Sequence, residues 1–131
     1  MIDLSEGIAV DAAHSTKNRK TEFQGVDLKT GNLLFYSDIG NQTINIGEFL
    51  AIVEGCKYIL KNDFKPKRIF SDSTTAISWF KNKKTASNKR NKYLMKAEIY
   101  LRAMSHWIDD IEVIKWDNNA WGETPADFGR K

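Results

Sequence analysis

Cysteine and long hydrophobic runs are scarce in this sequence. Cys56 is the single cysteine, which excludes a disulfide within the chain and makes a reducing, cytoplasmic location the simplest expectation. No apolar stretch approaches the length of a membrane-spanning helix. The first residues also lack the basic and apolar regions of a signal peptide. We therefore expect a protein that does not associate with membranes.

The rest of the composition is that of a folded protein. Hydrophobic residues make up 41% of the 131 residues and charged residues 28%. A disordered chain would not carry four Trp, four Tyr and seven Phe. The length suits a single buried core, and we expect one monomeric domain over residues 1–131. The formal net charge of +3 suits a polyanionic partner without requiring one.

Hydrophobic periodicity predicts an α/β plan, or an α+β plan with a mixed sheet. The expected strands are residues 7–13, 21–27, 33–39, 68–71 and 111–116, and the expected helices are residues 46–61, 73–80 and 93–108. Short loops join the first three strands, which predicts an antiparallel meander. The crossover through the first helix predicts that the fourth strand runs parallel to the first.

Two aspartates fall near the carboxyl ends of the predicted parallel strands. Asp72 follows strand 68–71, and Asp11 lies near the end of strand 7–13. They would then lie side by side, at the edge where ligands bind in open α/β sheets. An alternative stays open for each residue. Asp72 is also a favoured type of helix N-cap, and Asp11 also suits a strand end that has left the core.

Two further carboxylates are candidates for the same place. Glu48 lies in the first turn of helix 46–61, where it would also fit a capping box with Asn45 as N-cap. The segment from Thr124 to Asp127 matches a capping box too, with Pro125 at its preferred position. The chain stops four residues after Asp127, and so short a helix would bury almost nothing. This favours a functional role for Asp127.

Four converging carboxylates would repel one another strongly unless cations neutralised them. Oxygen ligands without accompanying Cys or His suit hard ions, so the expected cofactor is Mg²⁺, with Mn²⁺ as a substitute. Two such ions about 4 Å apart can clamp the attacking and leaving oxygens of a phosphodiester. The sequence therefore predicts metal-dependent phosphodiester cleavage.

Residues 81–92, KNKKTASNKRNK, contain six basic residues and no acidic one. Most such runs are solvated loops. A basic protrusion beside an acidic pocket also suits the binding of backbone phosphates, and we favour this interpretation. The predicted nucleic-acid contacts are Lys81, Lys83, Lys84, Lys89, Arg90 and Lys92.

The order of these elements and carboxylates resembles type 1 ribonuclease H over essentially the whole chain. The matching residues are Asp11 in AVDAA, Glu48 in IGEFLAIVEG, Asp72 in FSDSTTAI and Asp127 in ETPADFGRK. The resemblance implies a five-stranded mixed sheet in the order 3-2-1-4-5, flanked by helices. It also implies Mg²⁺-dependent endonucleolytic cleavage of the RNA strand of RNA/DNA hybrids, which leaves a 5′ phosphate and a 3′ hydroxyl.

Outside the carboxylates the resemblance is uneven. Thr43 matches a family position that binds a phosphate of the DNA strand, and Asn45 matches an Asn that contacts bases in the minor groove. The family often has a His in the loop before the last Asp, whereas this chain has none between Trp116 and Asp127. Glu123 is a candidate to tune the metals or move a proton in its place. The loop after the first Asp, usually Gly-rich in the family, reads AHSTKNRKTEF here.

Two other functions stay open. A nuclease of the same fold that cuts DNA would use the same carboxylates, although the sequence shows no additional DNA-binding domain. The other alternative is a non-catalytic domain that binds hybrids. Against it, a protein that only binds polyanions gains nothing from an acidic pocket.

Overall fold

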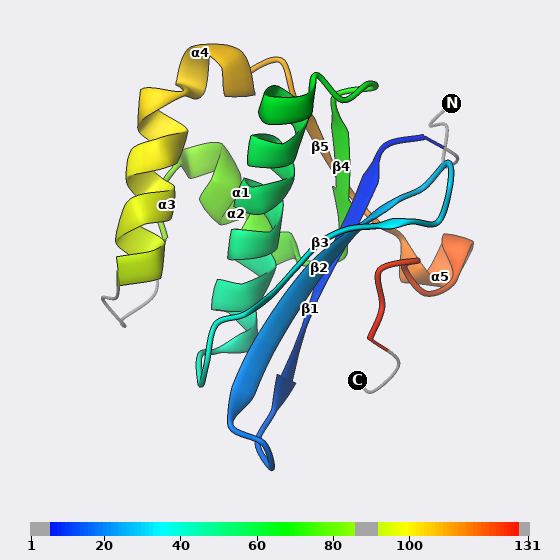
Figure 1. The fold of residues 1–131 in the computed structure, drawn as a ribbon, viewed down its shortest axis with the longest axis vertical. Coiled ribbons are helices and arrows are strands. Elements are labelled where there is room, and N and C mark those ends of the chain that lie inside the picture. Colours follow the sequence, from blue (N-terminus) through cyan, green and yellow to red (C-terminus); the bar gives the residue numbers. More distant parts are fainter. Residues whose placement is uncertain (1–5, 86–91, 129–131) are drawn as a thin grey trace.

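A five-stranded mixed sheet lies at the centre of the molecule, with its strands in the order β3-β2-β1-β4-β5 (Figure 1). The structure, a computed structural model, describes residues 6–85 and 92–128. The strands are β1 (Ile8–Ser15), β2 (Lys20–Asp27), β3 (Leu33–Asp38), β4 (Arg68–Ser71) and β5 (Glu112–Lys115). The helices are α1 (Ile44–Asn62), α2 (Thr74–Asn82), α3 (Lys92–Ala103), α4 (Ser105–Ile108) and α5 (Asn118–Trp121).

The pairing of the strands follows from the lengths of their connections. β1, β2 and β3 are joined by tight turns and pair antiparallel. β4 pairs parallel with β1, and β5 pairs parallel with β4, after helical crossovers. The predicted fold class and strand order are therefore confirmed.

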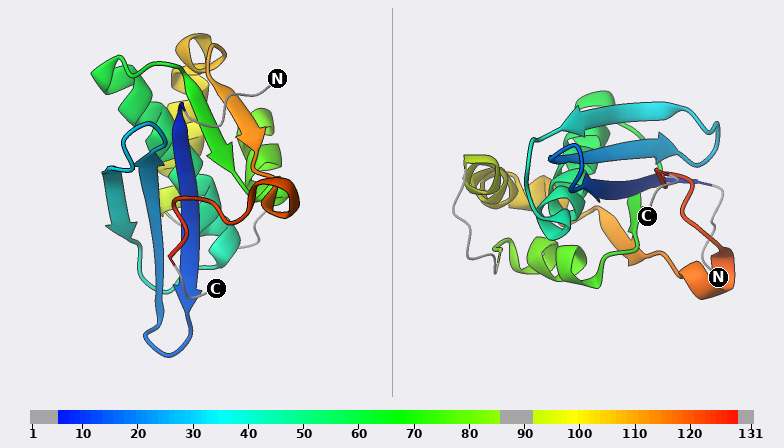
Figure 2. Two further views of the ribbon diagram at one scale, coloured as in Figure 1. Left: turned by 90° about the vertical axis from the view of Figure 1, so that its right-hand side faces the viewer. Right: turned by 90° about the horizontal axis from the view of Figure 1, so that it is seen from below.

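The two faces of the sheet are covered differently (Figures 1 and 2). Residues of β1 that point to one side, Ile8, Val10 and Ala12, join the large core made with α1, α2 and α3. The other face carries α5 and the C-terminal segment, which crosses β1 in the left view of Figure 2. There Ala126 packs with Ala9 and with a residue of β2 in a second, smaller cluster. Both faces of β1 are thus buried, as its continuous run of apolar residues predicts.

The predicted helix over residues 93–108 is wrong as a single element. The structure divides it into α3 and α4 at Met104, whose backbone leaves the helical conformation (φ −102°, ψ 12°). The apolar periodicity continues through this point, so the sequence pattern gives no sign of the break. Beyond it Trp107 is 53% exposed.

The last part of the chain also differs from the prediction. Residues 124–127 form a turn rather than a helix, although Thr124 Oγ1 does accept a hydrogen bond from the N–H of Ala126 at 3.4 Å. The short helix α5 was not predicted. Among the described residues, no helix combines the length and the apolar character that crossing a membrane requires.

Candidate functional site

Asp11 and Asp72 lie next to each other because β1 and β4 run parallel. In the register of this pair Ile8 is opposite Ile69, and Asp11 and Asp72 follow these two residues at the same distance of three positions. Asp72 comes directly after the last residue of β4. It does not cap α2, because Ser73 does: Ser73 Oγ accepts a hydrogen bond from the N–H of Ala76 at 3.0 Å.

Glu48 reaches the same place because α1 packs very closely against β1 and β2 at Gly47. A Cβ atom at Gly47 would lie 2.8 Å from Thr21 Cγ2 and 3.0 Å from Ala12 Cβ, so a larger residue would push the helix away from the sheet. The side chain that follows is held against β1: Glu48 Oε1 accepts a hydrogen bond from the backbone N–H of Ala12 at 3.3 Å.

The capping-box interpretation of Glu48 is wrong. α1 begins at Ile44, and its N-cap is Thr43, whose side chain accepts a hydrogen bond from the N–H of Ile46 at 3.4 Å. Asn45 therefore lies inside the first turn, and Glu48 is the fifth helical residue rather than the third. Its carboxylate is bound to a strand and not to the end of its own helix.

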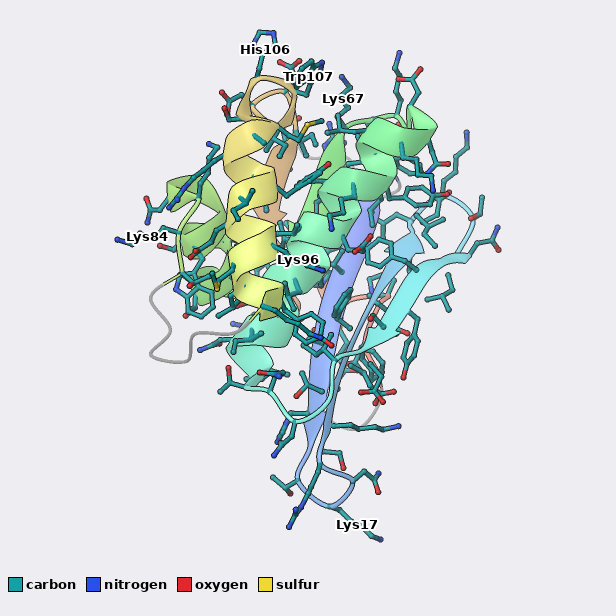
Figure 3. All side chains as sticks on the ribbon, turned by 60° about the vertical axis from the view of Figure 1, so that its left-hand side comes forward. Lys17, Lys67, Lys84, Lys96, His106 and Trp107 are labelled. Carbon is teal, nitrogen blue, oxygen red and sulfur yellow. The ribbon has the colours of Figure 1, made fainter. Side chains whose placement is uncertain are left out.

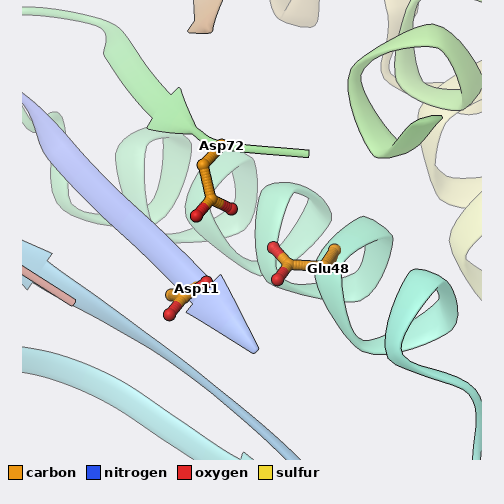
Figure 4. Close-up of side chains that lie close together, drawn as sticks. All are labelled: Asp11, Glu48 and Asp72. Atoms are coloured by element: carbon orange, nitrogen blue, oxygen red, sulfur yellow. The ribbon is translucent and has the colours of Figure 1, made fainter. Parts of the chain in front are cut away.

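The three carboxylates converge (Figure 4). One ligand oxygen from each of Asp11, Glu48 and Asp72 lies within 4.8 Å of the other two. Asp11 is fully buried, Glu48 is 4% exposed and Asp72 is half-buried. Two ionised carboxylates at this separation repel each other by roughly 3–4 kcal/mol at an effective dielectric constant of about 20. The arrangement is therefore costly without a cation.

The donor set fits a hard divalent cation. All three groups offer carboxylate oxygens, which suit Mg²⁺ and Mn²⁺ rather than the softer metals that bind thiolate or imidazole. Asp11, Glu48 and Asp72 come from a strand, a helix and a strand end. Because these elements are packed in one core, the ligands are held in place before any ion binds.

Two side chains that the sequence analysis did not single out hold Asp72 from outside the cluster. Asn118 Nδ2 donates a hydrogen bond to Asp72 Oδ2 at 3.4 Å. The ammonium group of Lys115 donates one to the backbone carbonyl oxygen of Asp72. Lys115 is the last residue of β5 and Asn118 is the first residue of α5. An Asn shortly after a strand carries no sequence signal that would have identified it as a partner of Asp72.

Among the described residues, Asp127 does not belong to the group of carboxylates whose oxygens lie within 4.8 Å of one another. The residue before it is nevertheless fixed on the face of the sheet that carries Asp11. Gln24, which pairs with Asp11 in the β1–β2 register, donates a hydrogen bond through Nε2 to the carbonyl oxygen of Ala126 at 2.6 Å. Ala126 is fully buried. Glu123 lies in the bend before this turn and is exposed.

The predicted nucleic-acid contacts lie at two other places. Thr43 and Asn45 are exposed at the start of α1. In the basic segment, Lys81, Lys84 and Lys92 are exposed. Of the other basic residues of the segment, Lys83 is paired with Asp109 at 3.5 Å. Lys89 and Arg90 lie outside the described residues.

Comparison with known proteins agrees with this geometry. A family model described as reverse transcriptase-like matches residues 9–119. Among solved structures, LC11-RNase H1, isolated from compost by a metagenomic approach, is 14% identical with a TM-score of 0.58, over 88% of this chain and 87% of that one. The same protein in complex with an RNA/DNA hybrid is 13% identical with a TM-score of 0.52, over 86% of each chain.

A viral protein shows the same likeness. The prototype foamy virus protease-reverse transcriptase, in its CSH mutant form, is 21% identical with a TM-score of 0.57. The match covers 86% of this chain but only 17% of the viral chain. At these identities the solved structures establish the fold, which is ribonuclease H-like.

Proposed function

This chain belongs to the reverse transcriptase-like family, and from that premise we propose that it cleaves the RNA strand of RNA/DNA hybrids in a reaction that depends on divalent metal ions. The observation that supports the proposal most directly is the convergence of Asp11, Glu48 and Asp72 within 4.8 Å. In a protein that only binds nucleic acid, three clustered carboxylates would weaken the binding, because their negative charge repels phosphates.

In this proposal Asp11, Glu48 and Asp72 hold two Mg²⁺ ions, for which Mn²⁺ can substitute, and Asp127 is the fourth ligand. The bound ions would supply Lewis-acid stabilisation of the phosphate charge and a water of lowered pKa. The protein itself fixes the ligands: the hydrogen bond from Ala12 to Glu48 and the one from Asn118 to Asp72 orient two of the carboxylates. Glu123, which is exposed four residues before Asp127, is assigned to proton movement.

Binding of the hybrid is assigned to exposed groups at the start of α1 and along α2 and α3. Thr43 and Asn45 stand at the start of the 19-residue helix α1, where backbone N–H groups and the helix dipole favour a phosphate. Lys81, Lys84 and Lys92 offer positive charge on the side of α2 and α3. A hybrid is the substrate to test first because LC11-RNase H1, a protein of the same fold, has been solved with one.

The test is incubation with a labelled RNA/DNA hybrid, with and without Mg²⁺, beside single-stranded RNA and duplex DNA. We expect cleavage of the RNA strand in the hybrid, only with metal, with 5′ phosphate and 3′ hydroxyl ends. Cleavage of duplex DNA instead would assign a DNA nuclease of the same fold, and no cleavage of any substrate would leave a binding domain.

A substitution in the cluster connects the activity with the site. Asp72→Asn should lower the cleavage rate by about 10²–10³-fold or more, because removing one ligand charge costs several kcal/mol of transition-state stabilisation. Binding of the hybrid should persist. Asp110→Asn is the matched control, since Asp110 is exposed and lies outside the cluster. Undiminished cleavage by Asp72→Asn would refute the assignment.

A further inference from the structure

The hairpin that joins β1 to β2 projects from the body of the molecule (Figures 1 and 3). β1 carries Asp11 and continues to Ser15. At a rise of about 3.3 Å per residue, Ser15 lies roughly 13 Å beyond Asp11 along the strand. A long ligand that is bound at the cluster and extends along β1 from Asp11 toward Ser15 would therefore pass the tip of the hairpin.

This hairpin is ordered by pairing along its whole length. The β1–β2 register continues without interruption from Ile8 opposite Asp27 to Ser15 opposite Lys20. Within the turn, the N–H of Asn18 donates to Ser15 Oγ at 3.1 Å, and Arg19 takes a left-handed backbone conformation (φ 51°). The side chains at the tip are thus presented on a rigid support.

The base of the hairpin is fastened to the segment that precedes α1. His14 Nδ1 lies 2.8 Å from Thr21 Oγ1, which in turn donates to the carbonyl oxygen of Gln42 at 2.6 Å. The N–H of Gln42 donates back to Thr21 Oγ1 at 3.2 Å. This network fixes the direction of the hairpin relative to the start of α1 and, through α1, relative to Glu48.

The hairpin tip, residues 15–20, carries three cations and no acidic residue. Lys17 and Arg19 are exposed, and Figure 3 shows Lys17 at the far end of the molecule. Lys20 is paired with Glu22 at 3.5 Å. Among the described residues no carboxylate lies within salt-bridge distance of Lys17 or Arg19. Two positive charges at the tip are thus available to an anionic ligand.

We propose that the hairpin tip is a phosphate-binding arm, in which Lys17 and Arg19 contact the sugar–phosphate backbone of the duplex bound at the carboxylate cluster. This inference rests on the proposed function and extends the proposed binding surface to the β1–β2 hairpin. A helical turn of duplex is roughly 34–36 Å long. A duplex centred on Asp11 and running along β1 therefore extends past the hairpin tip, about 13 Å away.

The experiment compares two double variants that both lower the formal net charge from +3 to +1. The arm variant is Lys17→Ala with Arg19→Asn, because Asn tolerates the left-handed conformation of residue 19. The control variant is Lys29→Ala with Lys67→Ala. Lys67 lies at the end of the molecule away from Lys17 (Figure 3), and Lys29 lies in the turn between β2 and β3.

Binding is measured with an RNA/DNA hybrid of about two helical turns, without divalent metal, over a range of KCl concentrations. For the arm variant, the slope of log K against log salt should become shallower by about 1.8, that is by about 0.9 for each lost phosphate contact. Its affinity at 0.1 M salt should fall roughly 10- to 60-fold. The control variant should keep the wild-type slope.

Cleavage gives a second measurement. The arm variant should show a raised KM with kcat within about twofold of wild type, because the lost contact is made equally in the ground and transition states. A hybrid too short to reach the tip should be bound equally by the wild type and the arm variant. An equal slope in the arm and control variants, or an arm variant that loses kcat alone, would overturn the proposal. If the wild type cleaves no hybrid, the proposed function fails instead.

Discussion

Asp72 is the most exposed carboxylate of the cluster, and two side chains from outside the cluster hold it. Asn118 contacts its carboxylate and Lys115 its backbone carbonyl group. Groups that orient a metal ligand typically contribute 10- to 100-fold to metal affinity or activity. Asn118 therefore has a positioning role in the proposed reaction, although it is not itself a ligand.

For Asn118→Ala we expect Mn²⁺ affinity to fall about 10-fold or more, because Asp72 would lose the donor that fixes its carboxylate. Binding of the hybrid without metal should not change. The measurement is a Mn²⁺ titration of the protein alone, beside the cleavage rate at saturating metal. Asn119→Ala, at the exposed neighbouring position, is the control. Equal Mn²⁺ affinity in the two variants would contradict the positioning role.

Cys56 shows what burial does to a single residue. It lies on the buried side of α1, and desolvation raises the pKa of its thiol from 9.0 to about 12. A thiol that stays protonated is a poor nucleophile. Cys56 is therefore a core residue, as its place on the apolar stripe predicts.

At pH 9 the native protein should react slowly with iodoacetamide and the urea-unfolded protein quickly. Because the folded pKa is raised, the stability contributed by Cys56 is fully present below about pH 9 and is lost as the pH rises toward 12. The loss is at most about 1.4 kcal/mol per pH unit. Urea unfolding at several pH values should show this component in the wild type and not in Cys56→Ala. Rapid alkylation of the native protein would refute it.

Among the elements, α1 does most to build the site. Its start carries Thr43 and Asn45, its first turns carry Glu48, and its buried face fills the core under β1. Two glycines of the helix are close to other parts of the protein, but they face different neighbours. A Cβ at Gly47 would meet Ala12 Cβ and Thr21 Cγ2, whereas a Cβ at Gly55 would meet the flexible end of Ile69 at 2.9 Å.

Gly47→Ala should therefore destabilise the protein by about 1–3 kcal/mol, the usual range for overpacking. It should also weaken Mn²⁺ binding, because α1 can relieve the clash only by moving Glu48 away from Ala12. Gly55→Ala is the matched control and should stay within about 1 kcal/mol of wild type, since its higher helix propensity offsets the shift of Ile69. Urea unfolding and Mn²⁺ titration of both variants provide the check. Normal metal binding by Gly47→Ala would show that Glu48 does not depend on this close packing.

On the scale of the whole molecule, the fold brings negative charge together that the unfolded chain keeps apart. Asp11, Glu48 and Asp72 are distant in sequence, and two of them are buried. Their repulsion is a cost of folding that a bound cation removes. Groups built for function often lower stability in this way.

Asp11→Asn should accordingly raise the Tm by several degrees when divalent metals are removed with EDTA, corresponding to about 1–2 kcal/mol. The same variant should lose most of the rise in Tm that Mg²⁺ or Mn²⁺ gives the wild type, because fewer ligands remain. Asp110→Asn, exposed and outside the cluster, should match the wild type in both conditions. A lower Tm for Asp11→Asn in EDTA would mean that the buried carboxylate is stabilising rather than strained.

The sequence by itself determined the order of the sheet and singled out the three carboxylates that converge, whereas Asp127, the fourth predicted ligand, stays a prediction. Strand 68–71 was predicted to the residue, because a short buried strand between a proline and a helix cap has a local signature. The parallel pairing that aligns Asp11 with Asp72 also followed from the sequence, since a crossover connection leaves little choice of direction. A cytoplasmic location and a monomeric state stay predictions.

Only the tertiary structure decided which alternatives hold for individual side chains. The hydrogen bond from Ala12 to Glu48 and the contact of Asn118 with Asp72 join residues that lie 36 and 46 positions apart. The anchoring of Ala126 by Gln24 spans 102 positions. Periodicity and capping signals describe neighbours along the chain, whereas these contacts depend on how closely a helix approaches a sheet and where a loop returns. For that reason the sequence identified the three carboxylates that converge, whereas packing determined their arrangement and added Asn118 beside Asp72.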